Sequence, residues 1–208
     1  MATPSRSSLA KRKSPVQARS QQRAQLILNT TRDLLREEGL GAVTTTAIAS
    51  RAGIPVSSLY QYYPNKKAIL MALYEDYLVK VRELFSQYDQ PKYLEQGREQ
   101  TLEQLIRHVN RVELRDEIED ELEKALDIYP ELAEIDRQHR EKFAEIMVEL
   151  LRKLGSRWSR ARLRRLALYS YALHSGTWAY RAEVKPRAKE LVEWNMTVSL
   201  AILGKCFD

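Results

Sequence analysis

Apolar side chains recur every three or four residues along most of the chain, which is the period of an amphipathic α-helix. The first such segment runs from Arg19 to Gly39, and its stripe consists of Leu26, Ile27, Thr30, Leu34 and Leu35. A longer stripe follows Pro64 and consists of Ile69, Leu73, Tyr77, Val81, Leu84 and Tyr88. No segment sustains the alternation that predicts a strand. We therefore predict an all-α fold of about nine helices.

Two short helical segments lie between these longer ones. The first, 47–52, follows a run of N-cap candidates, Thr44, Thr45 and Thr46. Gly53 ends it, and the second runs from Val56 to Tyr62 or Tyr63, with Pro55 near its first turn. The rest of the chain predicts helices near 93–113, 116–128, 131–154, 159–183 and 186–204.

The residues around Gly53 fit a helix-turn-helix, in which two short helices are joined by a tight glycine turn. The first helix needs a small apolar face, which is supplied by Ile48, Ala49 and Ala52. Ile54 and Leu59 fill the core from the turn and the second helix. The other side chains then face outward: Val56, Ser57, Ser58, Tyr60, Gln61 and Tyr62. Because many helical hairpins with such a turn bind nothing, a purely structural hairpin stays open here.

Charge is distributed unevenly along the chain. Residues 1–67 hold 11 Lys or Arg and 3 Asp or Glu, a net charge of +8, whereas the remainder has a net charge of −2. This excess lies where DNA phosphates would be met. Residues 1–18 are rich in Ser, Pro and basic side chains and predict a disordered basic arm. Its cations either contact DNA or only keep the chain in solution: Arg6, Lys11, Arg12 and Lys13.

Length and cysteine content limit the possible number of domains and the cellular compartment of the protein. The 208 residues allow one small and one medium domain, or a single larger one. The single cysteine, Cys206, excludes an internal disulfide and fits a reducing compartment. Neither an early apolar signal region nor a run of about 18 apolar residues is present. We expect a cytoplasmic protein without membrane contact.

The sequence offers no chemistry for catalysis. Its three histidines lie far apart, without a His-Glu-x-x-His motif or a pair of Glu-x-x-His motifs. A glycine-rich phosphate loop and a nucleophile elbow are also missing. We therefore expect no catalytic residues, no metal and no cofactor.

The segment TTTAIASRAGIPVSSLYQYYPNKKAIL (44–70) closely resembles the DNA-binding module of the tetracycline-repressor (TetR/AcrR) family. The family typically shows Thr, Ile-Ala, Ala-Gly-Val-Ser, Leu-Tyr-x-Tyr-Phe and Lys at these spacings. The resemblance runs from about Arg19 to Leu78, and beyond it covers only length and helical character. Pro55 departs from the family, since it stands where a capping Ser is common.

The resemblance implies DNA contacts at the matching positions. Thr44 would bind a phosphate at the helix start with help from Thr45 and Thr46, and further phosphates would be bound by Tyr60, Tyr62 and Lys66. Base edges would be contacted by Val56, Ser57 and Gln61, with Gln61 suited to adenine and Val56 to a thymine methyl group. Tyr63, where the family has Phe, would pack in the core.

Because one recognition helix reads only a few base pairs, we expect a homodimer on near-palindromic double-stranded operator DNA. The last two helices carry apolar or small residues on more than one face, as a family-like four-helix dimer interface would require. Its predicted residues are Leu166, Leu173, Thr177, Tyr180, Leu191, Trp194, Val198, Ala201 and Ile202. A larger monomer core is the alternative.

In the family, the C-terminal helices usually enclose a small-molecule effector whose binding releases the DNA. The resemblance thus implies a repressor with a helix-turn-helix domain at 19–66 and an effector-binding and dimerisation domain at 67–208. Candidate pocket residues are aromatic or polar groups within apolar helices: His108, Tyr129, His139, Phe143, Tyr171, His174 and Trp178. The rival hypothesis is a helical ligand-binding or adaptor protein whose hairpin is only structural.

Two charged runs lie in the second part of the chain, an acidic one at 116–123 and a basic one at 152–165. Solvated faces that attract each other within a dimer would explain both. A second surface for nucleic acid or an acidic partner at 152–165 is the alternative.

Overall fold

The computed structural model describes residues 15–113, 118–183 and 188–208, which are helical almost throughout and contain no strand. The described residues form ten α-helices rather than about nine, and the all-α prediction is confirmed. In order they are α1(Pro15–Glu38), α2(Thr45–Arg51), α3(Val56–Tyr60), α4(Lys66–Gln87), α5(Pro91–Leu94), α6(Arg98–Glu113), α7(Glu119–Ile128), α8(Pro130–Lys153), α9(Arg160–Glu183) and α10(Ala188–Gly204). A 3-10 helix, η2(Lys205–Phe207), follows α10.

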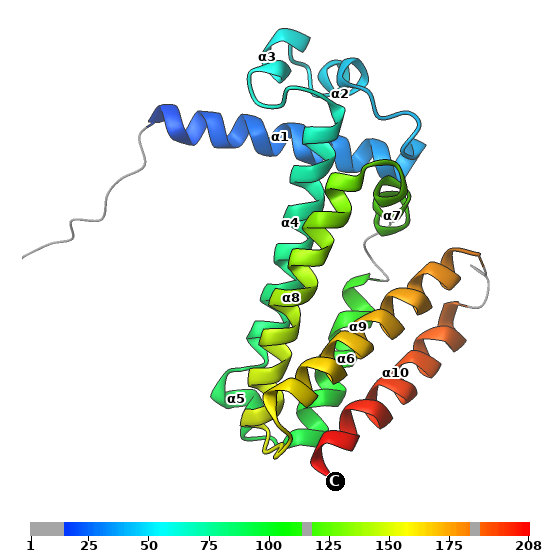
Figure 1. The fold of residues 1–208 in the computed structure, drawn as a ribbon. Coiled ribbons are helices and arrows are strands. Elements are labelled where there is room, and N and C mark those ends of the chain that lie inside the picture. The colour runs from blue at the N-terminus through cyan, green and yellow to red at the C-terminus, as the bar shows by residue number, and fades with distance from the viewer. Residues whose placement is uncertain (1–14, 114–117, 184–187) are drawn as a thin grey trace, which may run out of the picture.

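The two long helices α4 and α8 run side by side and form the spine of the molecule (Figure 1). At one end of this spine lie α1, α2, α3 and α7, and at the other end lies α5. Helix α9 packs on α8, and α10 packs on both α9 and α6. The short helices α2 and α3 therefore lie at one end of the molecule, and α5 lies at the opposite end.

Several predicted boundaries differ from the structure; α2, for example, spans Thr45–Arg51 rather than 47–52. The helix predicted at 93–113 is divided into α5 and α6 by Gly97, whose φ of +85° interrupts helical geometry. Helix α1 begins at Pro15 rather than Arg19, so residues 15–18 of the expected arm are helical, whereas 1–14 lie outside the described residues. Helix α3 ends at Tyr60, before the expected Tyr62 or Tyr63, and the Gln61 and Tyr62 N–H groups donate to carbonyls three residues earlier, as in a 3-10 turn.

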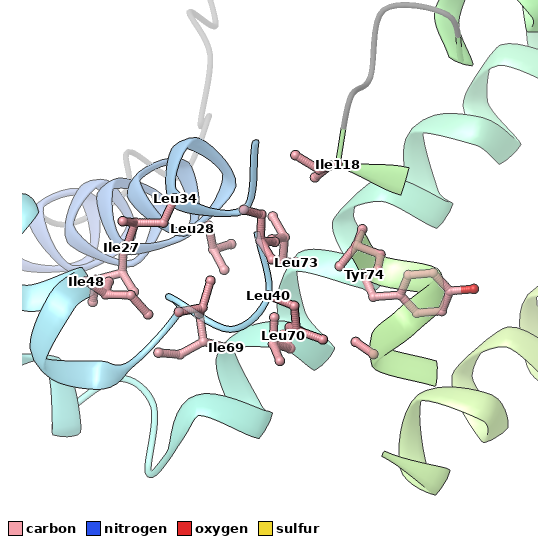
Figure 2. Packing of buried hydrophobic residues seen from close by; sticks show 14 of the residues in the cluster. Ile27, Leu28, Leu34, Leu40, Ile48, Ile69, Leu70, Leu73, Tyr74 and Ile118 are labelled. Atoms are coloured by element: carbon pink, nitrogen blue, oxygen red, sulfur yellow. The ribbon is translucent and has the colours of Figure 1, made fainter. Parts of the chain in front are cut away.

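Buried apolar side chains form two clusters. The first joins α1, α2, α3 and the start of α4, as Figure 2 shows for Ile27, Ile48 and Ile69. Ile118, Leu122, Ala125 and Leu132, from around α7 and the start of α8, belong to the same cluster. The second cluster lies between the far end of α4 and α6, α8, α9 and α10. The first cluster therefore includes residues of both segments predicted as domains, 19–66 and 67–208.

The predicted apolar stripes are almost all buried. In α4 every residue of the predicted stripe is buried except Val81, which is half-buried. In α1, Ile27, Thr30, Leu34 and Leu35 are buried, but Leu26 is 38% exposed. Leu26 precedes the first buried residue of α1, so it lies at the edge of the core.

Three of the seven basic residues in the run at 152–165 form ion pairs with described acidic residues of the same chain. Arg160 forms ion pairs with Glu145 and Glu149, and Arg164 pairs with Glu141, all on α8. The Lys153 ammonium lies 2.7 Å from a carboxylate oxygen of Asp89. In the acidic run, residues 116 and 117 lie outside the described residues.

Replacing a buried and an exposed leucine of α1 tests this core. Leu35 is 1% exposed. Leu35→Ala should therefore lower the free energy of unfolding by about 2–5 kcal/mol, because the substitution leaves a cavity. Leu26→Ala, on the same helix, should change it by less than about 0.5 kcal/mol. Urea denaturation followed by circular dichroism measures both, and equal losses would contradict this packing.

Candidate nucleic-acid interface

Helix α2 begins with a threonine cap. Thr44 has extended backbone geometry, and its Oγ1 accepts a hydrogen bond from the Ala47 N–H at 3.0 Å. Ile48 and Ala49, on the inner face of α2, are fully buried. Thr44 and Thr46 are exposed and Thr45 is half-buried. The start of α2 is therefore fixed from within while its threonines stay accessible.

A glycine turn joins α2 to α3. Gly53 has a φ of +63°, a left-handed conformation that other residues adopt at a cost. Its N–H donates to the Ser50 carbonyl, and the Ile54 N–H donates to the Ala49 carbonyl at 3.0 Å. Ile54 is thereby brought back into the core, where it is 7% exposed. The turn predicted from the sequence is present.

Helix α3 spans only five residues, and Leu59 anchors it through complete burial of its side chain. Its N-cap residue, Pro55, has no side chain that can accept a hydrogen bond, and no side-chain cap is formed there. The Pro55 carbonyl accepts from the Ser58 N–H at 2.9 Å. A helix this short depends on its surroundings, because few internal hydrogen bonds offset the cost of ordering it.

The side chains predicted to contact bases and phosphates lie on or beside α3. Ser57 and Gln61 are exposed, Val56 is half-buried, and Tyr60 is 50% exposed. The Tyr60 hydroxyl lies 3.2 Å from Thr45 Oγ1, within hydrogen-bonding distance. The predicted residues of the two short helices thus form one continuous polar surface.

Tyr62, Tyr63 and Lys66 lie deeper than the residues of this surface. Both tyrosines are half-buried against the first core, and burial raises the pKa of Tyr63. The Lys66 ammonium, expected on a phosphate, donates a 2.8 Å hydrogen bond to the Leu40 carbonyl, and partial burial lowers its pKa. Lys66 therefore holds the segment between α1 and α2 in this structure.

A second group holds the same segment from the other side. The Leu40 N–H donates to Glu121 of α7 at 2.7 Å, while Glu121 also pairs with Lys124. Leu40 is thus fixed at its carbonyl by α4 and at its N–H by α7. Sequence reasoning missed this contact, since Glu121 looked like one acidic residue in a solvated run.

The seven pocket candidates are only partly brought together. His139, Phe143 and Tyr171 form an aromatic cluster with ring centroids 5.3–6.3 Å apart. His174 contacts Asn195, His108 lies 3.2 Å from the Tyr88 hydroxyl, and Tyr129 packs on the first core. The Trp178 side chain lies outside the described residues.

Buried polar groups accompany this cluster. His139 Nδ1 lies 2.9 Å from an Arg82 nitrogen, and burial together with Arg82 lowers its pKa to about 4, so the ring is neutral at pH 7. Its other nitrogen, Nε2, is buried and has no hydrogen-bonding partner among the described residues. Asp136 accepts from the hydroxyls of Tyr74 and Tyr171 at 3.0 and 2.9 Å, and so connects α4, α8 and α9.

The predicted dimer residues lie on α9 and α10 with different exposure. Trp194 and Tyr180 are 60% and 51% exposed, and Val198 and Ala201 are also exposed. Leu191 is buried inside the protomer, and the remaining four are half-buried: Leu166, Leu173, Thr177 and Ile202. Tyr169, 59% exposed on α9, was not predicted.

Two further findings concern the described part of the chain. No group of three or more His, Cys, Asp or Glu side chains there is placed to hold a metal ion. None of its helices has the length and apolar composition needed to cross a membrane.

Comparison with known proteins identifies one matching family model and several solved structures of similar fold. Residues 27–73 match the family model of the bacterial regulatory proteins, tetR family. A chain from Mesorhizobium loti described as a TetR-family transcriptional regulator is 16% identical with a TM-score of 0.72, over 89% of this chain and 97% of that one. A TetR-family transcriptional regulator from Streptomyces coelicolor is 22% identical with a TM-score of 0.65, over 88% and 99%.

The regulator FadR from Bacillus subtilis, solved in complex with stearoyl-CoA, is 15% identical with a TM-score of 0.64, over 86% of this chain and 96% of that one. The curated proteins contain no match. The chain thus carries the N-terminal module of the tetR-family regulatory proteins, on the all-helical fold of TetR-family transcriptional regulators.

The turn between α2 and α3 can be tested with paired glycine substitutions. Gly53→Ala should lower the unfolding free energy by about 1–2 kcal/mol, because its φ of +63° strains any Cβ, although nothing lies within 4 Å of that atom. Gly41→Ala, equally open but without a positive φ, should cost less than about 0.5 kcal/mol. Thermal unfolding measures both, and equal stability of the two variants would exclude this turn geometry.

Proposed function

We propose that this protein is a sequence-specific DNA-binding transcriptional regulator, a homodimeric repressor that a small-molecule effector releases from a palindromic operator. The observation that carries the proposal is the surface formed by α2 and α3. A short helix with Leu59 buried and Ser57, Tyr60 and Gln61 accessible has the size and polarity of a major-groove reading element. The tetR-family match over 27–73 includes this whole surface.

Contacts divide between the two short helices by chemistry. The threonines of α2 and the Tyr60 hydroxyl offer hydrogen bonds to phosphates, which position a protein on DNA without reading it. Gln61 carries the amide that pairs with adenine, and Val56 offers methyl groups to thymine. Lys66 would have to leave the Leu40 carbonyl to reach a phosphate, so we assign it first to holding the α1–α2 segment.

Dimerisation supplies the second reading helix. A stripe with Trp194, Val198 and Ala201 on α10 is exposed in the single chain, beside exposed tyrosines of α9. Exposed apolar side chains on adjoining helices are typical of a surface that another protein covers. A twofold pairing of α9 and α10 with their copies would bury these residues and place two α3 helices on one face of a duplex.

The effector site is proposed around the aromatic cluster of His139, Phe143 and Tyr171. A neutral, buried histidine with an unpartnered nitrogen beside apolar rings is suited to bind a largely apolar ligand with one polar anchor. The B. subtilis FadR structure in complex with stearoyl-CoA supports a ligand site in this part of the chain, because a protein of similar fold binds a molecule with a long apolar chain.

Two contacts would transmit effector binding to the reading helices. Asp136 ties α4 to α9 beside the aromatic cluster, and Glu121 ties α7 to the Leu40 N–H. A ligand that favours a different position of α8 or α9 would disturb both. Because coupling between two binding sites is reciprocal, DNA must then weaken effector binding by the same factor.

Substitutions on α3 test the proposed DNA contacts. With duplexes enriched from a random pool by the parent protein, Tyr60→Phe should raise Kd about tenfold on every duplex, since a phosphate hydrogen bond is lost twice per dimer. Gln61→Ala should instead relax preference at one base pair per half-site, worth about 1–3 kcal/mol. Fluorescence anisotropy measures both.

Matched controls lie at the far end of the spine. Tyr93→Phe on α5 and Gln87→Ala at the end of α4 should leave Kd within twofold of the parent. If Tyr60→Phe and Gln61→Ala also bind as the parent does, the assignment of α3 as the reading helix is wrong. If the parent enriches no duplex, the adaptor hypothesis holds.

A charge on the exposed face of α10 tests the dimer. Trp194→Glu should raise the dimer dissociation constant at least about 100-fold, because a buried aromatic anchor is lost and two carboxylates enter an apolar interface. Ile128→Glu, on α7 and 59% exposed, is the matched control and should remain dimeric. Sedimentation equilibrium distinguishes the states, and an unchanged constant for Trp194→Glu would place the interface elsewhere.

A further inference from the structure

The N-terminal part of α1 extends beyond the core. Helix α1 has 24 residues, and from residue 19 onward, where burial is described, its first buried residue is Ile27. Of residues 19–26, all are exposed except the half-buried Ala24. Figure 1 shows this part of α1 projecting past α2, α3 and α4, which lie at its C-terminal half. About two turns of helix, residues 19–26, are therefore formed largely without a packing partner.

The composition of this projection does not explain its stability. Arg19 and Arg23 are four residues apart, so like charges face each other on one side of the helix. The first turn contains no acidic residue that would complement the helix dipole. An isolated helix of this length is marginal in water. Its features point to a partner that supplies negative charge.

The arginines of α1 differ according to whether they lie over the core. Arg32 forms a 3.1 Å ion pair with Asp76, and Arg36 forms one of 3.0 Å with Asp33. Within the described residues, Arg19 and Arg23 enter no ion pair and are exposed. The first 32 residues of the sequence contain seven Lys or Arg and no Asp or Glu. No acidic residue within this segment can therefore neutralise Arg19 and Arg23.

We propose that the projecting segment 15–26 of α1 is a second DNA-contacting element, which binds backbone phosphates flanking the half-site through Arg19 and Arg23. The inference rests on the proposed function and adds a contact that no base sequence specifies. A segment of 12 residues spans about 18 Å, and duplex DNA carries a negative charge about every 1.7 Å, so several phosphates lie within its reach. These phosphate contacts would add to the DNA affinity that the short helix α3 provides, and would leave the base preference of the protein unchanged.

The test uses the full-length double variant Arg19→Gln, Arg23→Gln and two 40-bp duplexes, one selected by the parent and one scrambled. Titrations between 50 and 300 mM KCl should show the slope of log K against log[KCl] falling by about 3 to 4, because two phosphate contacts are lost in each of two protomers. Affinity at a fixed salt concentration should fall by the same factor on both duplexes.

Three comparisons make the result specific. Arg19→Lys, Arg23→Lys should restore the parental slope, because the charges return. Arg157→Gln, Arg165→Gln removes two exposed arginines from the second part of the chain and should leave the slope unchanged. Trimming the selected duplex to its half-sites should abolish the difference between the parent and the Gln variant.

The possible failures are separable. If the parent binds neither duplex, the proposed function itself fails. If the parent prefers the selected duplex but the Gln variant keeps the parental slope, only the role of the α1 projection is overturned. If the slope falls equally in the Arg157→Gln, Arg165→Gln variant, the lower net charge of the protein explains the change. That result would also overturn the proposed role of the α1 projection.

Discussion

The position of α3 depends on the burial of Leu59 against α2. A helix of five residues has almost no stability of its own, and its N-terminus lacks a side-chain cap. Leu59 is fully buried, Ile54 returns to the core after the Gly53 turn, and both pack with Ile48 and Ala49. These contacts determine which side of α3 remains accessible. The accessible side carries the polar groups from which the proposed DNA binding follows.

The same core extends into the second part of the chain. Ile118, Leu122 and Leu132 are buried with the residues of α1 and α4, and Glu121 binds the backbone between α1 and α2. A rearrangement of α7 or α8 therefore changes the support of the reading helices directly. This shared packing gives a physical route for the proposed effector control, because residues of both parts belong to the first cluster. It also explains why Leu40 is held from both sides.

Local patterns predicted much of this arrangement. The periodic stripe of α4, the glycine turn and the inward positions of Ile48 and Leu59 follow from spacing and side-chain size alone. Contacts between segments distant in sequence were not predictable in this way. Glu121 looked solvated and Lys66 looked free to bind phosphate, yet each binds the backbone of Leu40. Arg160 and Arg164, in a run that looked solvated, form ion pairs with α8. Likewise, the exposed residues of α10 could not be predicted without knowing which face of that helix α6 and α9 cover.

The central claim is that two copies of α3 read DNA together. Selection of duplexes from a random pool by the full-length protein tests it most directly. The account predicts an enriched inverted repeat, with half-site centres about one helical turn or slightly more apart, about 10 bp or beyond. Enrichment of no sequence, or of a single unrepeated site, would contradict it.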